Sequence, residues 1–217
     1  MDFYTNVIVF GNSVLVRGIK NGERVTTRLK YKPTLFVPVR KQTQYRSLDG
    51  KFLTPMVQET IKEAKEFVDQ YSNQPGMLYC FTRWPYQWIS DNFRGEIQWD
   101  INKIQVVTID IETESENGFP QVDHPIERVN AITLKNHQTK KFVVFGLHEW
   151  NTDRDDITYI QCNTEDELLQ RFLSFWSSNY PDVITGWNSR FFDIPYLVNR
   201  IKVRLGEDEI KKLSCFF

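Results

Sequence analysis

The stretch Val106–Thr113 reads VVTIDIET, and it decides how the second half of the chain is organised. Its apolar run predicts a strand that is buried on both faces. Two acids, Asp110 and Glu112, stand at the carboxyl end of this run. Because residues i and i+2 of a strand point to the same face, we expect the two carboxylates to lie together.

Two neighbouring carboxylates repel each other, so one is expected to take up a proton unless a cation lies between them. Mg²⁺ and Mn²⁺ prefer oxygen ligands, so such a pair indicates a divalent metal site. A lone D-x-E pair is also typical of a solvated strand end, and by itself it decides nothing.

A third acid, Asp193, strengthens the metal interpretation. It stands in ITGWNSRFFDIPY, just before a helix that is predicted from near Pro195. A parallel strand over residues 181–185 would bring Asp193 to the same sheet edge as Asp110. The helix N-terminus is expected to favour its ionised form.

The remaining pattern predicts a mixed fold of the α+β or α/β class. In the second half, strands are expected over residues 129–134, 141–145 and 181–185. A capping box at Thr164–Glu167 opens a helix there. In the first half, strands are expected over residues 3–10, 13–19, 23–31, 33–38 and 77–81, and helices over residues 57–71 and 84–93. Asn21-Gly22 is typical of a hairpin turn.

Composition and charge divide the chain in the same place. The 217 residues carry a net charge of −1, but residues 1–105 hold 15 basic and 10 acidic side chains, and the rest hold 12 and 18. We therefore predict two domains, residues 1–105 and 106–217. Three widely spaced cysteines exclude a disulfide framework and favour a reducing compartment. Without a signal peptide or a long apolar run, a cytoplasmic protein with no membrane partner is expected.

At this point the motifs resemble a family. TIDIET (108–113) resembles the first exonuclease motif of the family B DNA polymerases, and GWNSRFFDIPYLVNR (186–200) resembles the second. YRSLDGKFLTP (45–55) and ISDNFRGEI (89–97) extend the resemblance across the chain, and it is greatest toward the replicative polymerases of T-even-like bacteriophages. The resemblance implies a small β-rich N-terminal domain and a partial ribonuclease-H-like domain.

The resemblance also implies a reaction, the 3′→5′ proofreading hydrolysis of a frayed DNA primer end with two Mg²⁺ or Mn²⁺ ions. Asp110 would contact both ions, Glu112 would help bind the ion that activates water, and Asp193 would hold the second ion. Asn188 would bind the terminal nucleotide. Phe119, in the NGFP motif (117–120), would wedge against the last bases.

The sequence departs from the family pattern in one respect. The family has a fourth carboxylate in a downstream Y-x-x-x-D motif, whereas here Asp208 follows Arg204 rather than a tyrosine. The metal site is therefore expected to be incomplete. The apolar ending KKLSCFF suggests a split or excised piece, completed by the remaining polymerase chain as a partner.

Three alternatives stay open. Asp153–Asp156 offers replacement acids, although a solvated loop explains them as well. Ten basic residues between Arg17 and Lys51, with interleaved aromatics, predict either a phosphate-tracking surface for DNA or RNA or merely a soluble sheet face. Finally, the chain is either an exonuclease or a non-catalytic nucleic-acid-binding or assembly module.

Overall fold

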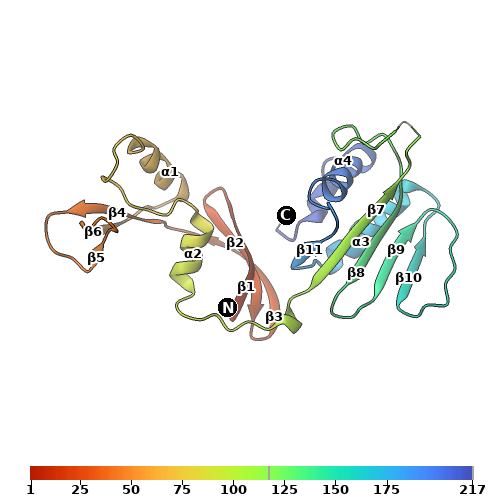
Figure 1. Ribbon diagram of the computed structural model, residues 1–217, viewed down its shortest axis with the longest axis horizontal. Helices are drawn as coiled ribbons and strands as arrows, with labels where there is room; N and C mark the ends of the chain where they lie inside the picture. Colours follow the sequence, from red (N-terminus) through yellow and green to blue (C-terminus); the bar gives the residue numbers. More distant parts are fainter. Residues whose placement is uncertain (117, 217) are drawn as a thin grey trace. The chain divides into compact units, whose positions relative to one another are not determined.

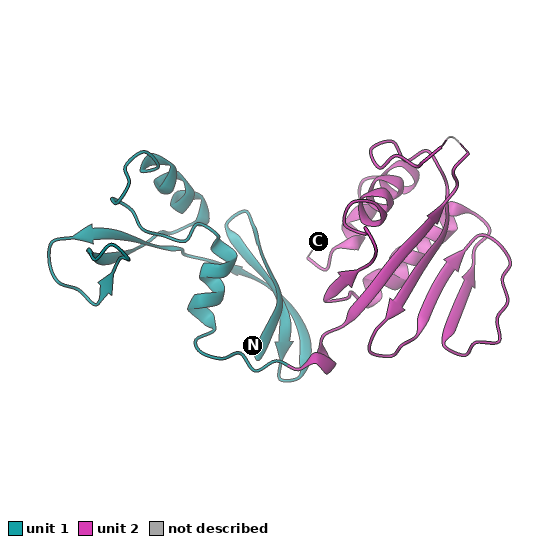
Figure 2. Cartoon of the chain, in the orientation of Figure 1, with its two compact units in different colours: residues 1–99 teal, residues 100–217 magenta. Residues whose placement is uncertain are grey.

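A computed structural model describes residues 1–116 and 118–216 of the chain. It divides into two compact units, Met1–Trp99 and Asp100–Phe217 (Figure 2). Asn117, which opens the NGFP motif, and Phe217, which closes KKLSCFF, lie outside the described residues. Across those residues, no helix is both long and apolar enough to span a bilayer.

Two small antiparallel sheets build the first unit (Figure 1). The first joins β1 (Phe3–Phe10), β2 (Ser13–Lys20) and β3 (Glu23–Lys30), and the second orders β4 (Thr34–Val39), β6 (Phe52–Val57) and β5 (Tyr45–Arg46) as β4-β6-β5. The predicted Asn21-Gly22 turn joins β2 to β3, and both residues have a positive φ, 53° and 80°. These are the backbone angles of a tight hairpin turn.

The helices of this unit begin and end largely as the pattern predicts, with two corrections. α1 (Ile61–Gln70) begins after Thr60, whose hydroxyl accepts a hydrogen bond from the Glu63 N–H at 3.1 Å. Val57 was predicted inside this helix, but it is the last residue of β6 and pairs with Thr34 of β4. The strand predicted over residues 77–81 is wrong in length, because only one bridge, Phe36 to Tyr79, forms there. α2 (Trp84–Asn92) matches its prediction within one residue.

A five-stranded sheet forms the centre of the second unit (Figure 1). Its order is β10-β9-β8-β7-β11, built from β7 (Val106–Thr113), β8 (Val129–Asn136), β9 (Phe142–Gly146), β10 (Ile157–Gln161) and β11 (Val183–Thr185). β7, β8 and β9 are mutually antiparallel, whereas β10 runs parallel to β9 and β11 runs parallel to β7. The parallel strand expected beside β7 is therefore confirmed, although it covers only Val183–Thr185 of the predicted residues 181–185.

Two helices cover one face of this sheet. α3 (Glu165–Ser178) packs on β8 and β9, and α4 (Asp193–Leu205) packs on β7. A short 3₁₀ helix, η1 (Ile101–Lys103), precedes β7, and another, η2 (Glu209–Leu213), follows α4. The buried core lies between helices and sheet, and it includes Ile109, Ile132, Phe145, Leu168, Phe172, Leu197 and Ile201.

Three sequence predictions for this sheet need correction. β7 is not buried on both faces, because Ile109 and Ile111 are buried while Asp110 and Glu112 are exposed. β11 is not buried at all, since it forms an edge of the sheet and its three residues are exposed. β10 was not predicted, because its sequence ITYIQ is short and follows a run of acids.

Candidate functional site

Asp110 and Glu112 lie on the sheet face opposite the core. They alternate along β7 with Ile109 and Ile111, which are 1% and 6% exposed. The pairing with β8 shifts register just after Glu112, so the ladder becomes irregular where the acids end. Within residues 1–116 and 118–216, neither carboxylate forms an ion pair. The predicted common direction of the two acids is therefore present, on an open surface.

Asp193, at the first position of α4, lies against the same end of β7. The pairing of β11 with β7 ends at Thr108, and β7 continues beyond this point without β11 beside it. Asp193 fills this place: its Oδ1 accepts a hydrogen bond from the Ile111 N–H at 3.1 Å, and the residue is only 3% exposed. The side chain of Asp193 thus contacts the backbone between Asp110 and Glu112 in sequence.

The electrostatics of Asp193 differ from the sequence expectation. Burial raises the pKa of its carboxyl above the ordinary value, and the charge of Asp110 raises the pKa further. The N–H groups of Ile111 and of Asp193 itself oppose this shift but do not cancel it. The helix N-terminus therefore does not lower the pKa of this carboxyl below its ordinary value. Burial and a like charge outweigh it because both penalise the carboxylate.

The TGWN segment (residues 185–188) leads from β11 to α4 and passes close to the backbone of β7. A Cβ at Gly186 would lie 2.5 Å from the Ile109 carbonyl oxygen, so only glycine fits here. Asn188 has a φ of 56°, and its carbonyl accepts hydrogen bonds from Phe191 and Phe192 at 2.9 and 3.0 Å. Its side chain is exposed. The turn that Asn188 forms thus places Asp193 against β7.

Phe119 lies at the same end of α4. Its side chain is 75% exposed, and its ring centroid is 5.4 Å from that of Phe192, the residue before Asp193. The Gln121 side-chain amide donates to the Phe119 carbonyl at 3.1 Å. An exposed aromatic ring therefore stands beside Phe192, the residue that precedes the buried acid in sequence.

The structure gathers the acids only in part. Among the described residues, no group of three or more His, Cys, Asp or Glu side chains is arranged to hold a metal ion. Asp110 and Asp193 are close enough to influence each other electrostatically, and all three acids offer the hard oxygen donors that Mg²⁺ or Mn²⁺ prefers. The donor chemistry therefore fits a divalent ion, although the described side chains do not surround one.

Asp153–Asp156 is not brought to this edge. It precedes β10, which two strands separate from β7, and neighbouring strands lie about 4.8 Å apart. Arg154 donates to Asp156 at 2.9 and 2.6 Å, which makes a local ion pair. The hypothesis that these acids replace a missing ligand at Asp110 is therefore not supported by the fold.

The basic residues of the first unit lie largely on β2, β3 and the loops after them. On β3, Arg28 donates to the Ser13 hydroxyl at 3.3 Å and lies over the Phe10 ring, while Lys32 pairs with Glu59. Arg17 is buried rather than exposed. Part of the predicted phosphate-tracking surface is thus occupied within the unit, and its role stays a prediction.

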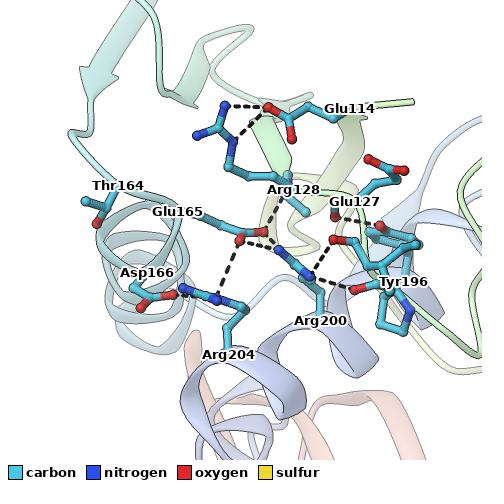
Figure 3. Close-up of polar contacts among 12 residues, drawn as sticks. Glu114, Glu127, Arg128, Thr164, Glu165, Asp166, Tyr196, Arg200 and Arg204 are labelled. Carbon is cyan, nitrogen blue, oxygen red and sulfur yellow. Dashed lines mark hydrogen bonds and ion pairs between the residues drawn. The ribbon is translucent and has the colours of Figure 1, made fainter. Parts of the chain in front are cut away.

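Sequence reasoning missed a buried ionic network beneath the site (Figure 3). Arg200 of α4 forms a two-pronged pair with Glu165 of α3, at 2.7 and 2.6 Å, and both side chains are less than a tenth exposed. The capping box predicted a hydrogen-bonding role for Glu167 only. The Glu167 N–H does donate a hydrogen bond to the Thr164 hydroxyl, at 3.2 Å. Nothing in the local pattern marks Glu165 as buried.

Comparison with known proteins agrees with the motifs. The family described as "DNA polymerase family B, exonuclease domain" matches residues 82–215. The DNA-directed DNA polymerase of Escherichia phage RB69 is 31% identical over 98% of this chain, and that of Enterobacteria phage T4 is 26% identical over 98%. The catalytic subunit of DNA polymerase delta from Candida albicans is 30% identical over 46% of the chain and 10% of that subunit. The chain spans about a quarter of the two phage polymerases, 27% and 26%.

Proposed function

This chain belongs to the family B DNA polymerases, and we propose that its second unit carries a 3′→5′ exonuclease that removes nucleotides from a frayed DNA end. The observation that supports this most is the contact of Asp193 with the Ile111 N–H, which joins the acids of two distant motifs at one edge. A ribonuclease-H-like fold is proposed with it, since the antiparallel β7–β8–β9 core and the parallel β11 agree with that arrangement.

The three acids would hold the divalent ions. Asp110 would contact both, Glu112 would help hold the ion nearest the attacking water, and Asp193 would face the second. When bound, such ions stabilise the charge that develops on phosphate oxygens. The exposed carboxylates of Asp110 and Glu112 suit this role because no cation among the described residues neutralises them.

Two further residues would bind the DNA end. Phe119 is exposed beside Phe192, so its free ring face would stack on an unpaired base at the 3′ terminus. The exposed Asn188 side chain stands on the turn before Asp193 and would hydrogen-bond the terminal nucleotide. Duplex DNA would be a poor substrate, since stacking requires a base that has left its partner.

A second candidate function is a non-catalytic nucleic-acid-binding or assembly fragment that the remaining polymerase chain completes. It is favoured by the incomplete gathering of acids among the described residues and by the exposed edge strand β11. In this case the protein would bind single-stranded DNA without hydrolysing it.

A degradation assay separates the two candidates. The chain is incubated with a 5′-labelled single-stranded oligonucleotide in Mn²⁺, beside Asp110→Ala and the control Asp155→Asn. The exonuclease proposal expects loss of 3′ nucleotides that Asp110→Ala slows by about a thousandfold, since a lost metal ligand removes several kcal/mol of transition-state stabilisation. Salt-sensitive binding without hydrolysis would favour the fragment, and no binding at all would overturn both. A matched RNA oligonucleotide tests which nucleic acid is preferred.

A further inference from the structure

The segment between β7 and β8 is a closed loop that carries Phe119. At its base the Glu114 N–H donates to the Arg128 carbonyl at 2.9 Å, and the Arg128 guanidinium pairs with the Glu114 carboxylate (Figure 3). The loop therefore leaves the sheet and returns at one point. Its interior residues must be positioned by contacts outside the strands.

α4 supplies these contacts from one face. The Tyr196 hydroxyl donates to the Glu127 carbonyl at 2.7 Å, and the Asn199 side chain donates to the Val122 carbonyl at 2.9 Å. Arg200 Nη1 donates to the carbonyls of Pro125 and Ile126 at 2.7 and 3.0 Å. Three side chains within one helical turn thus satisfy four backbone carbonyls of the loop.

Glu165 fixes the direction in which Arg200 donates. Its carboxylate takes the Nε and Nη2 hydrogens of Arg200, which leaves Nη1 directed at the loop (Figure 3). The same carboxylate accepts the Val129 N–H at 2.9 Å, at the start of β8. A single-point cation would not meet both requirements, because only a guanidinium presents such a fork of donors.

The same face of α4 continues to the candidate site. Asp193, Tyr196 and Arg200 are spaced three and four residues apart, so they lie along one stripe of the helix. At the top of the stripe, Phe192 contacts the ring of Phe119. One rigid helix therefore holds a candidate metal ligand at its start and the loop that carries Phe119 along its side.

We propose that Arg200, oriented by Glu165, is a positioning residue that holds Phe119 at the distance from Asp193 at which the ring stacks on the terminal base of single-stranded DNA. This rests on the proposed function, because it assigns a role in that same site. A purely structural role for the ion pair would stabilise the unit without affecting what Phe119 contributes to binding.

A double-mutant cycle tests the proposal. The affinity of the full chain for an oligonucleotide with 3′-terminal 2-aminopurine is measured by fluorescence in Ca²⁺, with and without Phe119→Ala. The cycle is run in the parent chain, in Arg200→Lys, and in Tyr196→Phe, which removes one donor and keeps the ring. Arg204→Lys is the matched control, because Arg204 lies one turn further on, pairs with Asp166 at 2.8 Å and approaches Glu165 only at 3.6 Å, and within the described residues it donates to no loop carbonyl. Melting curves confirm that each variant is folded.

The expected result is non-additivity. Phe119→Ala should weaken binding by about tenfold in the parent chain and in Arg204→Lys, the usual effect of one lost stacking contact. In Arg200→Lys the same change should weaken binding by less than about twofold, since the ring is already displaced, with an intermediate value in Tyr196→Phe. A tenfold effect in all four backgrounds would overturn this proposal alone. Absence of any Phe119-dependent binding in the parent chain would overturn the proposed function as well.

Discussion

Two groups of acids in the second unit experience opposite surroundings. Glu165 is buried, and its carboxylate accepts three hydrogen bonds, two from Arg200 and one from the Val129 N–H. Asp110 and Glu112 are exposed on the opposite sheet face, and they form no ion pair within the described residues. Asp193 stands between these extremes, buried but with one backbone donor to its Oδ1.

This difference separates a carboxylate that stabilises the fold, Glu165, from carboxylates that are accessible to a ligand, Asp110 and Glu112. A buried carboxylate with a full set of partners is satisfied, and removing a partner exposes a large desolvation penalty. Exposed carboxylates that form no ion pair keep their oxygens accessible to a cation from solution. The first group should therefore govern stability, and the second should govern ligand binding.

The largest expected change in stability comes from removing one partner of the buried Glu165–Arg200 ion pair. Arg200→Met removes both guanidinium hydrogen bonds from the buried Glu165 carboxylate and leaves it with the more distant Arg204, at 3.6 Å, so the free energy of unfolding should fall by about 3–5 kcal/mol. Denaturant unfolding measures this. The double variant Glu165→Met with Arg200→Met should recover much of the loss, because it removes both buried charges. A loss below about 1 kcal/mol for Arg200→Met would contradict the contrast between the two groups.

The exposed acids Asp110 and Glu112 should instead bind a divalent metal ion, and this binding should stabilise the folded chain. Mn²⁺ at a hundredfold excess over its Kd should stabilise the chain by about 2.7 kcal/mol, the value for a ligand that binds only the folded state. Asp110→Asn should abolish most of this stabilisation while leaving the metal-free melting temperature unchanged or slightly higher, because it removes repulsion with Asp193. Asp155→Asn is the matched control, and equal loss in both variants would show that the ion binds elsewhere.

Asp193 should show a smaller, pH-dependent effect. Burial and Asp110 raise the pKa of its carboxyl, so the folded chain binds this proton more tightly than the unfolded chain does. The parent chain therefore loses stability as the pH rises through the folded pKa, whereas Asp193→Asn does not. In chelator, the variant should melt higher than the parent at pH 7, and the gap should close as the pH falls toward about 4. A gap that is constant with pH would point to packing instead.

Much of this arrangement could be predicted from local pattern. Strand alternation predicted that Asp110 and Glu112 share one face. A helix predicted from near Pro195 put Asp193 close to the start of that helix. These are local consequences of strand and helix geometry. The metal-binding and DNA-binding roles remain predictions, because they depend on groups that local geometry does not supply.

The rest depends on tertiary contacts that no local pattern encodes. Glu165 and Arg200 are 35 residues apart, and each belongs to an ordinary amphipathic helix. The pKa of Asp193 depends on how deeply the sheet edge buries it, which the helix N-terminus alone does not determine. Likewise, Val183 and Ile184 have the composition of a buried strand, yet both are 44% exposed because β11 is the last strand of the sheet.

The smallest expected effect concerns this edge strand. Ile184→Thr keeps a β-branched residue in β11 and removes apolar surface that water already contacts, so the free energy of unfolding should change by no more than about 0.5 kcal/mol. Ile109→Ala, in the neighbouring β7, is the contrasting variant, and there the loss of a buried side chain should cost about 2–5 kcal/mol. Denaturant unfolding of the two variants compares edge with core directly. A loss of several kcal/mol for Ile184→Thr would mean that β11 is covered in solution, by a second copy or by another segment. Dilution would then identify a second copy, since its contribution depends on concentration.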